Sequence, residues 1–348
     1  MAKSKRSTVY NRITSEEKMK QVNDENIQLE EDYLEYLIST DRASSTIEQY
    51  RAVLHVFWCW NLDNNKNKPF VALTKREIAR FQNHALNEWG WSPRRMRMVK
   101  SVMRSLENYI SNILDDDYPD YRKIWDKIES PMNAAVREKS VFTDEELQKL
   151  LDYLVEHEDY MKACLVSLAI NSGRRKAELP RFKVSHFDDT NLICEGAIYK
   201  TPEKIVTKGR GQRGKLLYLY TLAKPFKPYL DLWLEERERL GIKTDWLFPQ
   251  YKNGQWLDEP IPTSTIDSYA RTFTKILKKP WYAHSLRHKF VSNLSEAGIP
   301  DNVIKDIVGW ADVSLVDVYR DTEAEDTFDK YFGAEGIKKV EQTNLNDL

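Results

Sequence analysis

The chain has 348 residues, of which 53 are lysine or arginine and 54 are aspartate or glutamate, giving a formal net charge of −1. This length favours two domains, because a single hydrophobic core stops growing at roughly 250–300 residues. The balanced charge neither indicates nor excludes nucleic acid as a partner, since a binder of this composition would separate its basic and acidic residues onto different faces. No apolar run reaches membrane-spanning length and the N-terminus lacks the apolar segment of a secretory signal, so we expect a cytoplasmic protein.

Three cysteines, Cys59, Cys164 and Cys194, lie far apart in the sequence among apolar residues. They form no Cys-x-x-Cys pair and show no spacing typical of a zinc site. We therefore expect reduced, packed thiols and no metal centre.

The first third of the chain predicts a compact helical domain at residues 25–126, preceded by a flexible basic arm at residues 1–24. The arm is polar and has no hydrophobic periodicity. In the domain, apolar residues recur at helical spacing from Leu29 to Leu37. The sequence Ser45-Thr46-Ile47-Glu48 has the pattern of a capping box and predicts the start of a second helix, and Thr74 predicts the start of a third.

The most regular helix of this domain begins at Ser92-Pro93 and has an apolar face and a separate basic face. The basic face consists of Arg94, Arg97, Lys100 and Arg104. Such a segregated face predicts contact with the phosphate backbone of DNA, the alternative being charges that only face solvent.

Weak periodicity, a proline and several charges predict an interdomain linker at residues 127–141. A second domain is then expected at residues 142–348. The sequence Thr143-Asp144-Glu145-Glu146 predicts the start of a helix. The apolar pattern of residues 161–169 predicts a buried helix that ends at Gly173.

Short apolar runs from Asn191 to Tyr220 are interrupted by the glycine-rich segment Gly209–Gly214. This pattern predicts a small antiparallel sheet with a hairpin loop. Helical signals return from Tyr229 onward, apart from loops around Gly254 and Pro260–Pro262. The expected fold class is therefore mainly α with a small antiparallel β-sheet (α+β).

Arg175 follows the predicted helix stop at Gly173, a position from which a guanidinium group can point into a cleft and bind a phosphate. The alternative is a surface arginine that pairs with Glu178. Pro180 predicts that any helix in this stretch is short or bent.

A second group of candidate residues lies in the last quarter of the chain. His284 and Arg287 are three residues apart, so on a helix they share a face and can reach one phosphate. The alternatives for His284 are a core histidine or a zinc ligand, and a zinc site would lack a clear third ligand. Trp310 follows a short predicted helix ending at Gly309, and its indole can donate an N–H or fill the core. The phenol of Tyr319 can attack phosphorus.

In this order, the Gly-x-Arg-x-x-Glu-Leu box around Arg175, the His-x-x-Arg pair, Gly309-Trp310 and Tyr319 resemble the tyrosine recombinase (phage integrase) family. The resemblance covers about residues 25–335. It implies that the chain is a site-specific DNA recombinase or integrase.

The resemblance also implies the architecture. The helical domain would be the family's core-binding (SAM-like) DNA-binding domain, with Ser45–Tyr50 similar to its usual Thr-x-x-x-Tyr helix. The second domain would be the catalytic domain with a C-terminal tail helix. Together the two would form a C-shaped clamp on DNA.

The implied mechanism uses neither a metal nor a cofactor. Tyr319 would attack the scissile phosphate, forming a 3′-phosphotyrosine and releasing a 5′-hydroxyl. Lys208 of the hairpin would protonate the leaving oxygen. Its competitors for this role are Lys200, Lys204 and Lys215. The pentacoordinate phosphorus would be stabilised by Arg175, His284, Arg287 and Trp310. The loop cations Arg210 and Arg213 would dock on backbone phosphates.

The implied partners are a double-stranded recombination site and further copies of this chain, monomeric or weakly associated in solution and tetrameric on synapsed DNA. Accessory directionality factors are a further expectation, as is a place on the bacterial nucleoid in a bacterial or phage-encoded protein. The apolar tail residues are Phe328, Tyr331, Phe332 and Ile337. They are expected to pack on a neighbouring copy, the alternative being packing on their own domain.

Two other readings of the same site stay open at the level of sequence. One is a type IB topoisomerase-like or hairpin-forming strand transferase, which would use the site without exchanging strands between duplexes. The other is a catalytically inactive DNA-binding relative.

Overall fold

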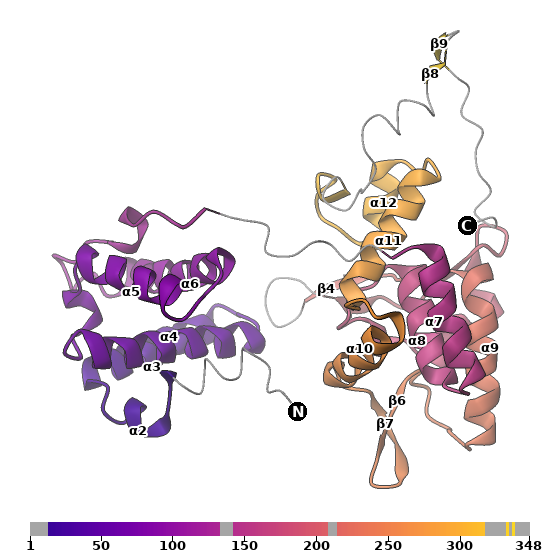
Figure 1. Cartoon of the computed structure of the whole chain (residues 1–348), viewed down its shortest axis with the longest axis horizontal. Helices are drawn as coiled ribbons and strands as arrows, with labels where there is room; N and C mark the ends of the chain where they lie inside the picture. The colour runs from indigo at the N-terminus through magenta and orange to yellow at the C-terminus, as the bar shows by residue number, and fades with distance from the viewer. Residues whose placement is uncertain (1–12, 133–141, 208–213, 317–331, 334–335, 338–348) are drawn as a thin grey trace. The chain divides into compact units, whose positions relative to one another are not determined.

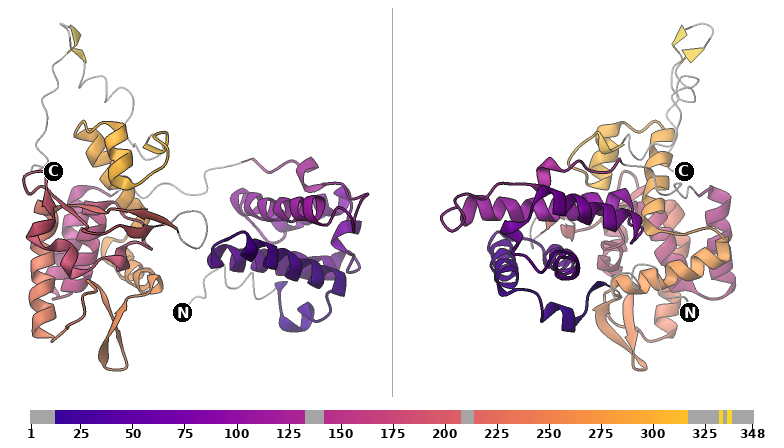
Figure 2. Two further views of the ribbon diagram at one scale, coloured as in Figure 1. Left: turned by 180° about the vertical axis from the view of Figure 1, so that it is seen from behind. Right: turned by 60° about the vertical axis from the view of Figure 1, so that its left-hand side comes forward.

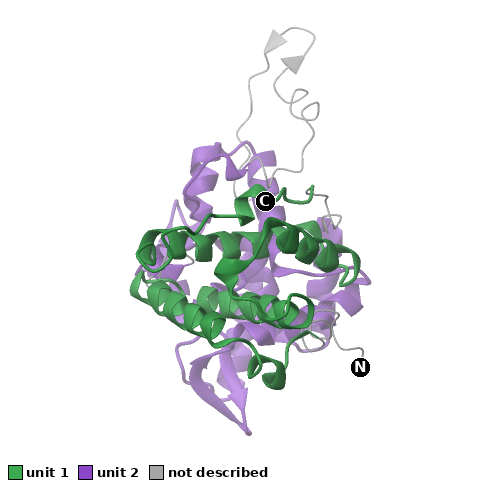
Figure 3. Ribbon diagram, turned by 90° about the vertical axis from the view of Figure 1, so that its left-hand side faces the viewer, with its two compact units in different colours: residues 1–138, 210–213 green, residues 139–209, 214–348 purple. Residues whose placement is uncertain are grey.

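The computed structural model describes residues 13–132, 142–207, 214–316, 332–333 and 336–337 (Figure 1). The chain forms two compact units, one of residues 1–138 with 210–213 and one of residues 139–209 with 214–348 (Figure 3). Each unit has its own hydrophobic core, and each is described by itself.

The first unit is helical. Its helices are α2 (Glu16–Met19), α3 (Asp24–Ser39), α4 (Ser44–Asn64), α5 (Lys75–Asn87) and α6 (Pro93–Ile113). Helix α3 packs on α4, and α6 packs on both α4 and α5. The core between them is aromatic: the Phe57 ring meets the edges of Phe81 and Trp125 at centroid distances of 5.0 and 5.4 Å. Edge-on ring pairs of this kind stabilise a core beyond the area that they bury.

Two of the predicted helix starts in this unit are confirmed. Thr74 forms a complete capping box with Glu77 at the start of α5, and the Ser92 side chain accepts from the Arg95 N–H at the start of α6. The capping box predicted at Ser45 is wrong. The N-cap of α4 is Ala43, two residues before Ser45, and it has no side-chain hydrogen bond, because alanine has no polar side-chain atom.

The predicted flexible arm is wrong for its second half. Ile13 and Val22 are buried in the core of the first unit, and α2 lies between them. The backbone of this stretch is tied down by Asn67, whose side-chain amide donates to the Gln21 carbonyl at 2.8 Å. Residues 1–12 lie outside the described part of the chain.

The described part of the predicted linker, residues 127–132, lies against the first unit. Side chains of α5 and α6 donate to its carbonyls: Gln82 to Glu129 at 3.0 Å, and Arg97 to Pro131 at 2.9 Å. The linker residues that follow, 133–141, are outside the described residues.

The second unit holds helices α7 (Asp144–Glu156), α8 (Tyr160–Ser172), α9 (Ala223–Arg239), α10 (Thr263–Leu277), α11 (Ala283–Glu296) and α12 (Asp301–Val308). Nine of the 13 residues of α8 are buried. This helix is the centre of the unit and packs against α7, α9 and α11. The buried helix ending at Gly173 and the Thr143 helix start are both confirmed.

The predicted small antiparallel sheet is present as two pieces. Strands β1 (Leu192–Ile193), β2 (Ile198–Lys200) and β5 (Tyr220–Leu222) form a three-stranded antiparallel sheet in the order β1-β2-β5. Strands β3 (Ile205–Thr207) and β4 (Lys215–Leu217) form a hairpin in which Thr207 pairs with Lys215. The fold class, mainly α with small antiparallel sheets, is confirmed.

The sequence analysis missed a second hairpin, β6 (Pro249–Lys252) with β7 (Gln255–Pro260), which projects from the second unit in every view (Figures 1 and 2). The loop predicted around Gly254 is only its turn. Asn253 and Gly254 have φ values of 52° and 81°, as a tight Asn-Gly hairpin turn requires. Helix α9 also begins six residues before the predicted Tyr229.

In the tail, a two-stranded antiparallel pairing of β8 (Phe332–Gly333) with β9 (Gly336–Ile337) takes the place of a helix at these residues. The remaining tail residues from 317 onward, including Phe328 and Tyr331, lie outside the described part of the chain.

Candidate active site

Arg175 lies just past the end of α8, where the backbone makes a turn that only glycine allows. Gly173 has φ +57°, and a Cβ atom at this position would lie 2.3 Å from Cδ1 of Phe290. The chain then forms a turn and a short 3-10 helix (Leu179–Arg181), as Pro180 predicted. The helix stop therefore fixes where Arg175 leaves the core.

Arg175 is oriented by a buried carboxylate. Its Nη1 lies 3.1 Å from Oε1 of Glu178, and its backbone N–H donates to the other carboxylate oxygen at 3.1 Å. The Glu178 side chain is 2% exposed, whereas that of Arg175 is 30% exposed. Arg175 therefore does pair with Glu178, as in the alternative considered from the sequence, and its guanidinium group still reaches solvent.

Arg287 of α11 is completely buried. Its Nη1 donates to the Gly173 carbonyl at 2.9 Å and its Nη2 to the Val308 carbonyl at 3.3 Å. One guanidinium group therefore joins the end of α8 to the end of α12, two places that are more than 130 residues apart in sequence.

Trp310 lies beside Arg287. Helix α12 stops at Gly309, which adopts φ +76°, and the Trp310 N–H donates back to the Lys305 carbonyl at 2.9 Å. The predicted helix stop is confirmed. The indole is 5% exposed, and its ring lies 5.1 Å from the guanidinium carbon of Arg287. A cation over an indole face at this distance is stabilising.

His284 is an exposed residue in the first turn of α11, between the buried Ala283 and Leu286. Partial desolvation of the imidazole, together with the positive charges of Arg287 and Arg175, lowers its pKa below the usual value. Its ring meets that of His288 edge-on at 5.3 Å. The structure thus brings Arg175, His284, Arg287 and Trp310, which come from three separate segments, to one place.

The remaining predicted site residues, Lys208, Arg210, Arg213 and Tyr319, lie outside the described residues. The elements that lead to them are described. A Cβ atom on Gly309 would lie 2.6 Å from Cδ1 of Leu217, so the base of the β3–β4 hairpin contacts the end of α12. Val316, three residues before Tyr319, is fully buried with residues of α11 and α12.

Arg174 is a residue of this region that the sequence analysis missed. It is 1% exposed, its Nε donates to the Ser172 carbonyl at 3.0 Å, and its Nη2 donates to the Ile307 carbonyl. Burial lowers its pKa to about 10, so it stays charged at neutral pH. In the sequence it is one cation in a Gly-Arg-Arg-Lys run, and nothing local marks it as buried.

The basic face of α6 differs from the expected continuous stripe. Lys100 is 8% exposed and donates to the Ile128 carbonyl, and desolvation lowers its pKa. Arg104 pairs with Asp126. The segment after α6 folds back and offers these partners, so Lys100 does not lie on an exposed surface. Arg94 and Arg97 are exposed.

The cysteines lie at separate places. Cys59 and Cys164 are buried, and burial raises the pKa of both thiols. The expectation of packing is wrong for Cys194, which is exposed in the turn between β1 and β2, with φ +51°. Across the described ranges, no three histidine, cysteine or acidic side chains are grouped so as to hold a metal ion. No described helix has the length and apolar character needed to cross a membrane.

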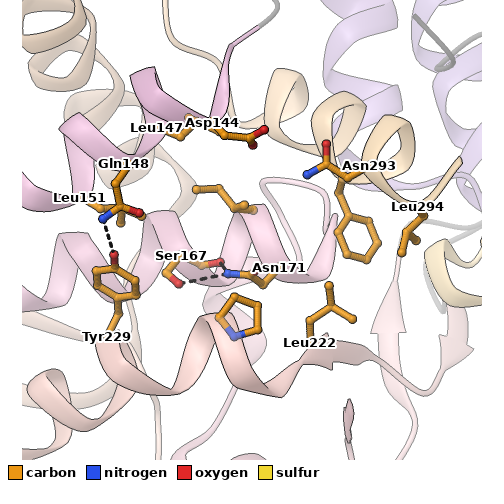
Figure 4. A pocket seen from close by; sticks show the side chains of 13 residues that line it. Asp144, Leu147, Gln148, Leu151, Ser167, Asn171, Leu222, Tyr229, Asn293 and Leu294 are labelled. Carbon is orange, nitrogen blue, oxygen red and sulfur yellow. Dashed lines mark hydrogen bonds between the residues drawn. The ribbon is translucent and has the colours of Figure 1, made fainter. Parts of the chain in front are cut away.

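A cavity of about 190 Å³ lies elsewhere in the second unit, among α7, α8, α9 and α11 (Figure 4). One polar contact joins two of its walls: Gln148 of α7 donates to the Tyr229 hydroxyl of α9 at 3.1 Å. Asn171 donates to the Ser167 carbonyl of its own helix, α8, at 2.9 Å. None of the predicted catalytic residues lines it.

Comparisons with known proteins agree with the motifs. The family model described as the phage integrase family matches residues 140–326, more than half of the chain. A recombinase-like protein, YomM, derived from the SPbeta prophage of Bacillus subtilis (strain 168) is 28% identical over 244 residues, covering 69% of this chain and 70% of that protein. A tyrosine recombinase of Pseudothermotoga lettingae is 25% identical over 312 residues, covering 86% and 95%.

Solved structures share the fold. A lambda integrase dimer bound to a COC′ core site superposes with a TM-score of 0.59 at 16% identity, covering 88% of this chain and 81% of that one. The XerH recombinase in a post-cleavage complex gives 0.57 at 18% identity, covering 82% and 78%. From its ordered motifs, its α-helical fold with small antiparallel sheets and the family match, the chain belongs to the phage integrase family and is a site-specific recombinase of the tyrosine type.

Proposed function

We propose that this chain cuts and rejoins duplex DNA at a specific site through a 3′-phosphotyrosine formed by Tyr319. The observation that carries the proposal is the meeting of Arg175, His284 and Arg287 at the joined ends of α8, α11 and α12. Three cationic or proton-exchanging groups around one point suit a phosphodiester, whose charge grows when a nucleophile adds.

In the proposed step the Tyr319 oxygen bonds to phosphorus, the phenolic proton passes to the His284 imidazole, and the bond from phosphorus to the 5′ oxygen breaks. Lys208 gives a proton to that oxygen as it departs. Because the phosphotyrosine keeps the energy of the broken bond, a 5′-hydroxyl from another strand can reverse the step and rejoin the DNA.

The electrostatics support distinct roles for the cationic groups. Arg175 is held by Glu178 yet reaches solvent, which suits a bidentate contact with phosphate oxygens. A lowered pKa keeps His284 neutral before DNA arrives, so its imidazole can accept a proton from the attacking phenol. The negative charge of a bound phosphate would then favour the protonated form.

We further propose a duplex recombination site as the substrate, bound by the first unit as a core-binding domain and the second as the catalytic domain of a C-shaped clamp. Four copies would assemble on synapsed DNA, with the tail of each packing on a neighbour. A lambda integrase tetramer bound to a Holliday junction is among the structures with this fold, at a TM-score of 0.59 and 16% identity. Accessory directionality factors and a place on the bacterial nucleoid belong to this proposal.

A nicked suicide substrate tests the proposal. Once the strand is cut, the short fragment between the cleavage point and the nick diffuses away. Its 5′-hydroxyl can then no longer reverse the reaction, so a covalent protein–DNA adduct accumulates. We expect such an adduct at the 3′ side of the break, and joined recombinant products from two intact duplexes. An adduct with no recombinant product would favour the topoisomerase-like alternative, and no adduct on any cognate site would favour an inactive relative.

A further inference from the structure

Two guanidinium groups hold the carboxyl end of α12. Arg174 donates to the Ile307 carbonyl, and Arg287 donates to the next carbonyl, that of Val308. The last four carbonyls of a helix have no partner within the helix and carry the negative end of its dipole. Two cations at this point therefore fix the end of α12 both by hydrogen bonds and by charge.

Arg174 fixes that end against α8. Its Nε donates to the Ser172 carbonyl, in the last residue of α8, at 3.0 Å. A buried charge is costly unless its hydrogen bonds are made, and an apolar side chain of similar volume would satisfy packing alone. The side chain is 1% exposed, and its Nε and Nη2 both donate to backbone carbonyls.

The residues that Arg174 holds lead directly into the active site. Gly309 follows the two bonded carbonyls, and a Cβ atom on it would lie 3.9 Å from Nη1 of Arg174. Trp310 comes next and lies over the Arg287 guanidinium group. Arg175, which contacts Glu178, is adjacent to Arg174 in the chain.

We propose that Arg174 is a positioning residue for catalysis: it fixes the end of α12 against the end of α8, and so sets Trp310 beside Arg287 in the geometry that receives the phosphate. This inference rests on the proposed function, together with the role in stabilising the pentacoordinate phosphorus that the family resemblance implies for Trp310. Arg174 itself touches no reacting atom.

A double-mutant cycle tests it. The rate of covalent adduct formation is measured in single turnovers at saturating DNA for Arg174→Met, Trp310→Phe and the double variant. We expect Arg174→Met to slow the wild-type chain by about tenfold, as misplaced groups do, with the DNA dissociation constant changed by less than about twofold. In the Trp310→Phe background, Arg174→Met should slow adduct formation by less than about threefold, because the indole that Arg174 positions is already absent.

Two further variants separate positioning from loss of a buried arginine. Arg237 is also buried, at 4% exposure, and bonds the Thr244, Trp246 and Leu247 carbonyls far from α12. Arg237→Met lowers the melting temperature but leaves the rate of the folded protein within about twofold. Arg174→Lys can still donate to one of the two carbonyls, so it should recover part of the rate of adduct formation. If Arg174→Met does not fold, Arg174→Lys replaces it in the double-mutant cycle.

The outcomes separate this inference from the proposed function. A tenfold loss in both backgrounds, or a weaker dissociation constant at an unchanged rate, would overturn the positioning role while the wild-type adduct still supports the recombinase activity. A wild-type chain that forms no adduct would overturn both.

Discussion

The basic side chains of two arginine-rich stretches of this chain, helix α6 and the loop after α8, have different surroundings. In α6, basic residues spaced along a helix face turn to partners in their own chain: Lys100 to a backbone carbonyl, and Arg104 to Asp126. In the loop after α8, Arg174 is buried under the end of α12, and Arg175 is held at the surface by a buried carboxylate. The regular stripe is the more conspicuous in sequence, but the irregular run supplies Arg175 to the candidate active site.

A basic pattern in the sequence can indicate that charges share a helix face, but it does not indicate whether that face is exposed. A stripe on a helix establishes only that the charges share a face, and a following segment of chain can cover that face. An arginine placed after a glycine helix stop is constrained more tightly, because the left-handed residue fixes the direction in which the chain leaves the core.

Among substitutions that keep the attacking tyrosine, the largest effect on the cleavage rate is expected at the hairpin of the second unit. Lys208→Ala should slow cleavage of ordinary DNA by roughly 10²–10⁴-fold, the usual contribution of a general acid. A substrate with sulfur in place of the 5′ bridging oxygen should restore the rate, since a thiolate leaves without being protonated. The same measurement on Lys200→Ala, Lys204→Ala and Lys215→Ala serves as the control. Rescue of one of these instead of Lys208→Ala would move the general acid to that lysine.

The glycine stop after α8 is expected to be the next most sensitive position. Gly173→Ala places a Cβ atom in a left-handed residue and against the Phe290 ring, which should destabilise the second unit by roughly 2–5 kcal/mol. Gly241→Ala is the matched control: its φ is +68° but nothing lies within 4 Å, so only the backbone strain of about 1–2 kcal/mol remains. Equal losses of melting temperature in the two variants would contradict the close packing.

The charge cluster can be examined through His284. The pKa of His284 is lowered by partial desolvation of its ring and by the positive charges of Arg287 and Arg175. Removing one of these charges in Arg175→Met should therefore raise the pKa of His284, as measured by NMR titration. Arg239→Met, which removes an arginine of the same unit that pairs with Glu236, should leave that pKa unchanged. A pKa that does not respond to Arg175→Met would mean that the two side chains are not close in solution.

The smallest effect is expected for the basic residues of α6, in the salt dependence of DNA affinity. Arg94 is exposed, so Arg94→Ala should reduce the slope of log affinity against log salt by about one. Lys100→Met should leave the slope unchanged and lower the melting temperature of the first unit, because Lys100 is buried against the Ile128 carbonyl. A reduction of the slope by about one in Lys100→Met would contradict the burial of Lys100 and show that its charge meets a phosphate.

Most helix starts and stops were predictable from the sequence, the capping box at Ser45 being the exception, whereas contacts distant in sequence were not. The capping boxes at Thr74 and Thr143 and the glycine stops at Gly173 and Gly309 are decided within a few residues, and all four predictions are confirmed. The turn at Asn253-Gly254 was equally local, and the missed hairpin had a recognisable signal.

The burial of Arg174 and Lys100 had no such signal. The Ile307 carbonyl that accepts from Arg174 is 133 residues away, and the Ile128 carbonyl that accepts from Lys100 is 28 residues away. A side chain's partner at such a separation is set by tertiary packing, which periodicity does not encode. The assignments of Lys208 and Tyr319 stay predictions.

The central claim, that this chain attacks DNA through one tyrosine, is tested most directly by mapping the attachment point. The adduct trapped on a nicked suicide substrate is digested with protease and nuclease, and the modified peptide is sequenced by mass spectrometry. We expect a nucleotide on Tyr319, and we expect Tyr319→Phe to bind the same DNA but to form no adduct. A nucleotide on another tyrosine, or an adduct that persists in Tyr319→Phe, would contradict it.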